Sequence, residues 1–585
     1  MTAHPGTDDG LEVRVTGGVV RGVREREMLA WRGMPYAAPP IGARRFRAPA
    51  PVLPWSGVRD ASAYGAVAPQ ANVIRLMRPT MSVLMADEDC LSVNVHAPDR
   101  DAGGSPLPVM VFIHGGGYSA GSSRDFSGQG EGFVRSGRVV YVSFNYRLGA
   151  LGYLDFTRYS SGGRTFESNL GLRDQVALLG WVRENIAAFG GDASRVTVVG
   201  ASAGGNAVTT LMTTPSARGL FARAIAQSPP PDAVYSRDLT ARWAAEYVAI
   251  LRQVVREKAE RAERNLAVRA AAARGHVVRN GAAPRADAPD DDAARADAAS
   301  EDTAPDAASE DAAADAPRRP GAPRHAAAPP TPQQLLTEAS ADDLVAASVV
   351  LQVRTPDAYI GAFCFAPVVD GEVVPERPFV AFRDGRAHRV PLIIGTNERE
   401  GTIFRGRVDI LPRTPKRIDG LFAQAPGHSR QAMRDAYPEL PARRAATDFG
   451  GDYGFWYPST RVADTCSRHG PVWSYRFDLA PRLLRLVGLD ATHGVEMFAL
   501  FDRTDAPVAR VMTSLGGNEE YAAAGERMRQ HWLHFAETGA PTPAWPRYDE
   551  RARSTLVIDT SDRVESDPRS ERRRAWDAFA PSLAG

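Results

Sequence analysis

The sequence predicts an α/β fold with a central, mostly parallel twisted sheet flanked by helices, and three patterns along the chain indicate it. First, short runs rich in Val, Ile and Phe show little alternation of apolar and polar residues, as expected of strands buried on both faces. These runs lie at 108–114, 139–146 and 196–200. Second, residues 170–190 carry apolar side chains at helical spacing and end in a Gly-Gly-Asp stop. Strand, helix and strand in this order build a parallel sheet.

The third pattern is an antiparallel hairpin near the amino terminus. Residues 11–22, LEVRVTGGVVRG, alternate apolar and polar residues around the pair Gly17-Gly18. This alternation has the period of two strands joined by a tight turn. We therefore expect a small hairpin and a mixed start to the sheet.

The length of the chain allows one large domain with an insertion. With 585 residues, 44% of them hydrophobic, it can bury a sizeable core. We predict a single domain formed by residues 11–255 and 333–580, interrupted by a charged, alanine-rich insertion at 256–332. The first part of the insertion could extend a helix that begins near Thr240. After Gly281 almost no residue is larger than alanine, so burial cannot offset the ordering entropy and we expect disorder.

The insertion has two possible interpretations. It could be a partner-binding or regulatory arm, or it could be a tolerated surface insertion. The second is favoured, because lengthening a surface loop costs little stability.

The charge balance excludes some classes of partner. The chain has 70 Lys and Arg against 69 Asp and Glu, a formal net charge of +1. No global field exists to attract nucleic acid or an anionic membrane, so neither is an expected partner. Only Lys258 and Lys416 are lysines, and we interpret the arginine excess as surface composition.

The cysteines and the amino terminus indicate a compartment. Cys90, Cys364 and Cys466 are an odd number scattered through a large chain, which argues against a disulfide scaffold and for reducing conditions. Asp8 and Asp9 stand where a signal peptide would need a basic and then an apolar run, and no uninterrupted apolar stretch reaches about 18 residues. We expect a cytoplasmic protein without a membrane partner.

Ser202 lies in the motif with the clearest chemistry. The segment VTVVGASAGG places it between Gly200 and Gly204, after an apolar strand and before a segment that can start a helix. Glycines flank the serine because the turn is strained and leaves no room for side chains, and the helix start supplies amide donors. A bare GxSxG occurs often by chance, but this context predicts a nucleophile elbow with Ser202 as nucleophile.

A second glycine-rich motif, HGGG at 114–117, also follows an apolar strand. Without Cβ atoms, glycine N–H groups can approach an oxyanion closely. The natural donors are the backbone N–H groups of Gly116, Gly117 and Ala203, the residue after the nucleophile. A glycine-rich turn with no catalytic task is the alternative.

The partners of the nucleophile must lie downstream, because a chain with this elbow carries its acid and then its histidine after the serine. Residues 390–404 supply an apolar strand followed by Glu398 and Glu400, either of which could be the acid. His493 lies in the loop-like stretch DATHGVEMFALF, whereas most other histidines lie in the insertion, before a strand or on a helix. We therefore predict a serine hydrolase on the α/β-hydrolase fold, with His493 as general base.

With these residues identified, the chain resembles the type-B carboxylesterase family, which includes the bacterial para-nitrobenzyl esterases, the liver carboxylesterases and the cholinesterases. The similarity extends from about Arg21 to Phe579 and includes motifs in family order. They are FRAPAPVLPWSG, DEDCLSVNVHAP, HGGGYSAGSS, FNYRLGALGYL, NLGLRDQVALLGWVRENIAAFGGD, VTVVGASAGG, FAPVVDG, GTNEREG, THGVE and HWLHFAETGAPTPAWPRY.

The resemblance implies a bacterial serine carboxylesterase that acts through an acyl-enzyme, and it assigns the site residue by residue. It implies Ser202 as nucleophile, Glu400 rather than Glu398 as acid, His493 as base, Gly116, Gly117 and Ala203 as oxyanion hole, and Ser228 as a hydroxyl beside the acid and the histidine. It also implies two structural ion pairs, Arg45 with Glu88 and Arg147 with Asp174.

The chain departs from the family pattern at several places, two of which concern charge at the site and disulfide pairing. Ala201 replaces the glutamate usual before the nucleophile, which removes a negative charge and makes choline esters less expected. Ala68 replaces the first cysteine of the family's loop disulfide, so Cys90 has no partner.

No metal or organic cofactor is expected, because the sequence contains no HExxH, no paired CxxC and no phosphate-binding loop. The expected partner is a small-molecule ester, and the expected assembly is a monomer or a small homo-oligomer. An amidase, lactonase or acyltransferase could use the same triad. A non-catalytic adhesion or scaffold protein of this fold is less expected, because all triad positions and oxyanion glycines are present.

Overall fold

The computed structural model describes residues 10–71, 85–100, 104–125, 130–279, 329–404 and 409–579. It divides into two compact units. The first comprises Met1–Val254 and Pro332–Gly585, and the second comprises Val255–Thr331. The segment after Gly281 for which we predict disorder lies, up to residue 328, outside the described residues.

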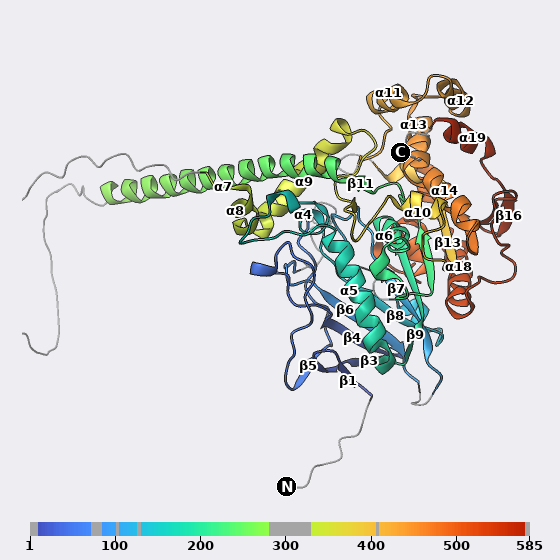
Figure 1. Cartoon of the computed structure of the whole chain (residues 1–585), viewed down its shortest axis with the longest axis horizontal. Coiled ribbons are helices and arrows are strands. Elements are labelled where there is room, and N and C mark those ends of the chain that lie inside the picture. Colours follow the sequence, from blue (N-terminus) through green and yellow to red (C-terminus); the bar gives the residue numbers. More distant parts are fainter. Residues whose placement is uncertain are drawn as a thin grey trace, which may run out of the picture. The chain divides into compact units, whose positions relative to one another are not determined.

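The first unit is built on a large mixed sheet (Figure 1). Within the described residues this sheet has eleven strands in the order β16-β15-β14-β13-β10-β9-β7-β8-β6-β4-β3. Neighbours from β8 to β15 run parallel, and β6, β4, β3 and β16 add antiparallel edges. The strands are β3 (Val23–Glu25), β4 (Met28–Pro35), β6 (Ser92–Pro98), β7 (Leu107–Ile113), β8 (Val140–Phe144), β9 (Gly191–Ala201), β10 (Arg223–Gln227), β13 (Leu392–Asn397), β14 (Val472–Phe477), β15 (Ser554–Ile558) and β16 (Arg563–Ser566).

The central strands have the burial that their composition predicts. Every residue of β6, β8 and β13 is buried, as are all residues of β7 after its first. The predicted strands at 108–114, 139–146 and 196–200 are confirmed as β7, β8 and the second half of β9. Because parallel strands carry helices on both faces, such runs need no alternation.

The amino-terminal hairpin forms, but it does not begin the large sheet. β1 (Glu12–Val15) pairs antiparallel with β2 (Gly18–Arg21), and β5 (Val58–Asp60) completes a separate three-stranded sheet. The antiparallel edge of the large sheet comes instead from β3, β4 and β6. The expected hairpin and the expected mixed start to the large sheet are both present, but the hairpin does not supply that start, because alternation shows that two strands pair and not which third strand joins them.

Helices connect and cover the strands of the first unit. They are α3 (Glu131–Val134), α4 (Gly149–Tyr153), α5 (Leu170–Asn185), α6 (Ala203–Leu211), α8 (Pro332–Glu338), α9 (Ala341–Ala358), α10 (Pro378–Arg383), α11 (Pro415–Gln424), α12 (Ser429–Ala436), α13 (Arg443–Gly451), α14 (Tyr457–Ser467), α15 (Arg482–Leu486), α16 (Glu496–Leu500), α17 (Pro507–Met512), α18 (Asn518–Thr538) and α19 (Ser570–Phe579). The predicted helix at 170–190 is α5 followed by the 3₁₀ turn Ile186–Phe189. A short parallel pair, β11 (Tyr235–Ser236) with β12 (Val368–Val369), lies apart from the large sheet.

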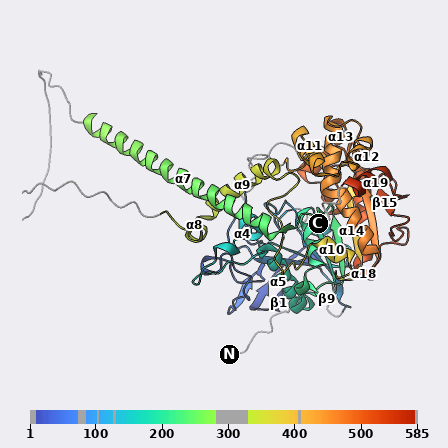
Figure 2. The same ribbon diagram turned by 45° about the horizontal axis from the view of Figure 1, so that its top comes forward.

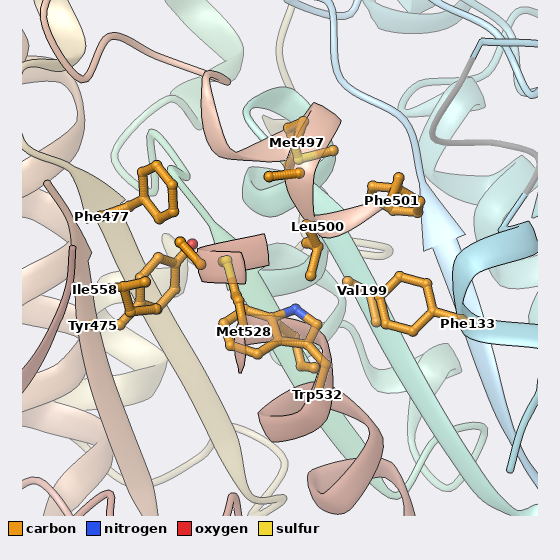
Figure 3. Packing of buried hydrophobic residues seen from close by; sticks show 14 of the residues in the cluster. Phe133, Val199, Tyr475, Phe477, Met497, Leu500, Phe501, Met528, Trp532 and Ile558 are labelled. Carbon is orange, nitrogen blue, oxygen red and sulfur yellow. The ribbon is translucent and has the colours of Figure 1, made fainter. Parts of the chain in front are cut away.

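One large core lies between the sheet and the helices α16 and α18. Figure 3 shows Met528 and Trp532 of α18 beside strand residues such as Tyr475 and Val199. Trp532 and Met528 are fully buried, which is the behaviour expected of large apolar side chains at a helix–sheet interface. This packing anchors α16, the helix that directly follows the loop of His493.

A second core joins four helices. Side chains of α11, α12, α13 and α19 pack around Trp576, Phe449 and Met433, and both views show these helices together (Figures 1 and 2). Phe449 and Trp576 lie 5.0 Å apart between ring centroids.

One long helix, α7 (Arg237–Arg279), belongs in part to each unit. The expected extension of a helix beginning near Thr240 into the charged segment therefore occurs. Residues 256–269 of α7 are exposed, Lys258 among them, and Lys416 on α11 is exposed as well. No helix in the part of the chain that the structure describes is long and apolar enough to cross a membrane.

Candidate active site

Ser202 lies at the sharp turn between β9 and α6. Its backbone has φ 58° and ψ −122°, a conformation that costs energy for any residue other than glycine and that clusters at functional sites. The Ser202 N–H donates to the Gln227 carbonyl oxygen at 2.8 Å, and the Ser202 carbonyl oxygen accepts from Asn206 at 2.9 Å. The turn is therefore held from β10 and from α6.

The glycines around Ser202 are required by close backbone contacts. A Cβ atom at Gly204 would lie 2.0 Å from the carbonyl oxygen of Ile113, and one at Gly200 would lie 2.3 Å from that of Gly204. Neither oxygen can move away without moving the sheet or the helix. The two glycines of GxSxG thus allow the turn at Ser202 to pack closely against the neighbouring strand β7.

The HGGG turn at 114–117 follows β7, the strand next to β9. Gly116 and Gly117 have φ +111° and +60°, and a Cβ at Gly115 would lie 3.1 Å from the Ser202 Cβ. Among the described residues, nothing accepts a hydrogen bond from the N–H groups of Gly116, Gly117 or Ala203. These donors therefore lie beside the nucleophile turn without an internal partner.

Glu400 contacts His493. Glu400 opens a 3₁₀ turn, η5 (Glu400–Ile403), which follows β13 after Glu398 and Arg399, and its carboxyl is buried. The His493 Nδ1–H donates to Glu400 Oε2 at 2.5 Å. The other oxygen, Oε1, accepts from the Ser228 hydroxyl and from the Asn397 N–H, both at 2.6 Å. Because the carboxylate engages Nδ1, it leaves Nε2 of the imidazole as the nitrogen that can accept a proton.

Glu398, the other candidate acid, makes no hydrogen bond to His493 among the described residues. Burial, and next the charge of Asp478, raise the pKa of its carboxyl. The spacing of the sequence leaves both glutamates open, and the geometry joins only Glu400 to the histidine.

Ser202 and His493 lie at the same edge of the sheet without a direct bond. No hydrogen bond joins Ser202 to His493 among the described residues. They are linked instead through β10: Gln227 accepts from the Ser202 N–H, and the next residue, Ser228, donates to Glu400. Hydrogen bonds between catalytic groups often tighten only in the complex with substrate.

Charge raises the basicity of His493. Burial alone would lower the pKa of its imidazole, but the charge and hydrogen bond of Glu400, and then the charge of Glu496, outweigh it, so the pKa is raised. The ring also packs against two phenylalanines, with centroids 5.3 Å from Phe404 and 4.6 Å from Phe455. Sequence reasoning missed both aromatic contacts, because nothing in the sequence relates either phenylalanine to residue 493.

Sequence reasoning also missed a second buried carboxyl, Glu496. Asn397 Nδ2 donates to its Oε2 at 2.6 Å, and Gln227 Nε2 donates to its Oε1 at 3.5 Å. Burial, and next the charge of Glu400, raise the pKa of Glu496 to about 7. Its place three residues after His493 was the available signal, since a glutamate inside an apolar stretch needs partners when buried.

Both ion pairs that the resemblance implied are present. Arg147 binds Asp174 through two nitrogens at 2.6 and 2.8 Å, with the side chains 4% and 0% exposed. Arg45 binds Glu88 with Nε at 2.7 Å. Cys90 is buried and free.

A small hollow lies beside the glycine-rich turn. It is lined by Ser119 and Ala120 of the turn, by Leu148 and Leu151, and by residues of α9 that include Leu344. No group of three His, Cys, Asp or Glu side chains able to hold a metal ion occurs in the described ranges.

A sequence profile of the carboxylesterase family matches residues 9–266 and 326–576. The chain belongs to the carboxylesterase family. This carboxylesterase is 31% identical to the para-nitrobenzyl esterase of Bacillus subtilis, over 95% of its own length and 96% of that protein.

Solved structures agree with the fold. A PNB esterase structure superposes with a TM-score of 0.74 at 30% identity, covering 97% of this chain and 99% of that one. A carboxylesterase of Geobacillus stearothermophilus gives a TM-score of 0.71 at 27% identity, over 97% of this chain and all of that one. The carboxylesterase therefore has the α/β-hydrolase fold, with its parallel strands ending at the edge that carries Ser202 and Glu400.

Proposed function

We propose that this carboxylesterase hydrolyses small carboxylic esters with Ser202 as nucleophile, His493 as general base and Glu400 as the acid that orients the histidine. The observation that carries the proposal is the 2.5 Å hydrogen bond from His493 Nδ1 to Glu400, at the sheet edge where Ser202 has its strained backbone. A serine, a histidine and an acid in this chain order are what an α/β-hydrolase uses for acyl transfer.

In the first half-reaction His493 Nε2 takes the proton of the Ser202 hydroxyl, and Oγ attacks the ester carbonyl carbon. The carbonyl becomes a tetrahedral oxyanion, which then collapses and expels the alcohol with the proton from His493. Water repeats the attack on the acyl-enzyme, and the carboxylic acid leaves as Ser202 regains its proton. The charge of Glu400 stabilises the imidazolium that forms twice.

The oxyanion is proposed to rest on the backbone N–H groups of Gly116, Gly117 and Ala203. These donors have no partner among the described residues, so they need not break a bond to bind the developing charge. Preorganised donors of this kind are commonly the largest single contribution to such a reaction. The hydroxyl of Ser228 holds the second oxygen of Glu400 and so fixes the carboxylate plane.

The proposed substrates are uncharged esters with small to medium acyl groups. The hollow beside the turn carries leucine side chains, and Ala201 places no negative charge next to the nucleophile to attract a cation. Because the chain is similar to a para-nitrobenzyl esterase, a para-nitrobenzyl ester is a suitable probe.

The test is a panel of para-nitrophenyl esters of rising acyl length, assayed with wild type and Ser202→Ala. The wild type should prefer short to medium chains, and the variant should lose at least about 10³-fold in kcat. Equal activity in both proteins would show that another residue is the nucleophile. A matched anilide, a lactone and an added alcohol acceptor test amidase, lactonase and acyltransferase activity, which share the acyl-enzyme.

A further inference from the structure

The glycine-rich turn that carries two proposed oxyanion donors is clamped by a side chain from outside it. Gln70 Nε2 donates to the Gly121 carbonyl oxygen at 2.9 Å, and the Gly121 N–H donates to Gln70 Oε1 at 2.9 Å. The carboxamide thus pairs with Gly121 in both directions, as a neighbouring strand would. A third bond, from Nε2 to the Ala68 carbonyl oxygen at 3.1 Å, fixes the amide plane.

Gly121 is the residue at which this turn closes. It has φ +108°, and a Cβ there would lie 2.4 Å from the Gly115 carbonyl oxygen. Between the two ends, the N–H groups of Ser119 and Ala120 both donate to the Gly116 carbonyl oxygen at 3.1 Å. A displacement of Gly121 is therefore passed through the closed turn to Gly116.

The turn needs such a clamp because three consecutive glycines give it little stiffness of its own. Glycine has the largest freedom of any residue, yet donors that stabilise an oxyanion must be fixed before charge develops. Contacts also hold the middle of the turn: Gly149 N–H donates to the Tyr118 carbonyl oxygen at 2.7 Å, and Gln352 donates to the Ser119 hydroxyl at 3.0 Å. Among the described residues, Gln70 is the only hydrogen-bond partner of Gly121.

From this geometry we infer that Gln70 is a positioning residue of the oxyanion hole. It does not touch the reacting atoms, and its effect passes through Gly121 to the N–H groups of Gly116 and Gly117. The inference rests on the proposed function, since it concerns the same site. Its consequence is that the loss of the Gln70 amide weakens binding of the transition state more than binding of the ester.

The test compares Gln70→Ala with Gln333→Ala. Gln333 is a matched control because its amide also donates to two loop carbonyls, those of Tyr159 and Arg164, at 3.1 and 3.0 Å, and its Oε1 accepts from Ser161. Gln70→Ala should lower kcat by about tenfold or more, with KM changed less than about threefold, because misplaced donors act mainly on the transition state. Gln333→Ala should leave both parameters within about twofold of wild type, since it touches no part of the turn.

A pair of inhibitors separates positioning from a general structural effect. An alkyl trifluoromethyl ketone forms a tetrahedral oxyanion on the serine, whereas the matched methyl ketone stays trigonal. In Gln70→Ala the inhibition constant of the first should rise by the factor lost in kcat/KM, and that of the second should stay unchanged. If both constants rise equally, or if neither kcat nor the first constant changes, Gln70 is not a positioning residue.

A second variant protects the test against misfolding. Gln70→Glu keeps the length of the side chain and the acceptor for the Gly121 N–H, and it replaces the Nε2 donor to the Gly121 and Ala68 carbonyl oxygens by a second acceptor. It should remain folded and lose kcat in the same direction, whereas wild-type kcat in this variant would overturn the inference. If Ser202→Ala is fully active, the proposed function itself fails; if it is inactive while Gln70→Ala is unimpaired, only the positioning role fails.

Discussion

At the scale of single residues, the proposed mechanism predicts that the charge of Glu400 sets the pH range of activity. In that mechanism His493 must be neutral to accept the Ser202 proton, so activity should fall as pH drops through the pKa of His493. Glu400 raises this pKa by its charge and its hydrogen bond. Glu400→Gln should therefore move the acidic limb of kcat/KM to lower pH.

The same variant should lower kcat by at least about a hundredfold, because an amide no longer stabilises the imidazolium or fixes the Nδ1–H tautomer. The measurement is the pH profile of kcat/KM for one para-nitrophenyl ester. Ser228→Ala is the control, since it removes one donor to Glu400 and keeps the charge. An acidic limb that stays in place would exclude Glu400 as the partner that sets the pKa of His493.

Glu496 makes stability depend on pH in a defined direction. Its pKa is raised from 4.5 to about 7 in the folded chain, so the folded state binds its proton more tightly than the unfolded state does. Stability from this group is present below about pH 4.5 and is lost as pH rises through 7, by about 3 kcal/mol in total. The Glu496→Gln variant should not lose this stability as pH rises through 7.

Glutamine fits at position 496 because the network can adapt. Gln227 Oε1 has no hydrogen-bond partner among the described residues, so turning its amide lets it accept from the new NH₂ group while Asn397 keeps its acceptor. Denaturant unfolding at pH 5 and pH 8 is the measurement. The variant should match wild type at pH 5 and exceed it at pH 8, and a parallel loss at both pH values would contradict the assignment.

The single residues also mark the limit of sequence reasoning. A local motif predicts Ser202, whereas chain order and a loop-like setting predict His493. Phe404, Phe455, Asn397 and Gln70 have no such pattern, since their contacts join segments distant along the chain.

At the scale of elements, the elbow depends on glycine where α6 meets β7. Gly204→Ala should destabilise the protein by about 3 kcal/mol or more, because its Cβ would meet backbone oxygens at 2.0 Å from Ile113 and 3.0 Å from His114. Gly180→Ala is the matched control, since Gly180 lies within α5 and a Cβ there meets nothing within 4 Å. It should stabilise by up to about 1 kcal/mol. Thermal unfolding measures both, and a Gly204→Ala protein as stable as wild type would contradict the packing argument.

Elements were the most predictable part of the fold. The runs that became β7, β8 and β9 are apolar on both faces, and this pattern has few alternatives inside a large chain. The hairpin at 11–22 shows the limit: local alternation predicted its two strands, but only tertiary packing decides that β5 is their neighbour.

At the scale of the whole molecule, the charged insertion should be dispensable for catalysis. In α7 the stretch from Val255 to Arg279 rises about 36 Å along the helix axis at about 1.5 Å per residue. If only the segment after Arg279 were deleted, a linker would have to start about 36 Å along the helix from Val255. The deletion must therefore remove this stretch together with the segment that follows it. We expect that replacing 256–331 by a Gly/Ser linker of about 12 residues, with an end-to-end distance of about 19 Å, leaves kcat/KM within about twofold.

The assay for this replacement uses the same ester panel together with thermal unfolding. A partner-binding role would appear as a partner captured by the full chain and lost by the shortened one, with turnover unaffected. Loss of turnover in a folded, shortened protein would show that the insertion supports the site.

The scarcity of lysine has a practical consequence for attaching this enzyme to surfaces. Apart from the α-amino group, Lys258 on α7 and Lys416 on α11 carry the only primary amines of the chain, and both side chains are exposed. Amine-directed reagents therefore have very few attachment points, one of them on the stretch of α7 that belongs to the second unit. Changing Lys416 to arginine would confine side-chain conjugation to Lys258, so that immobilised molecules share a common tether.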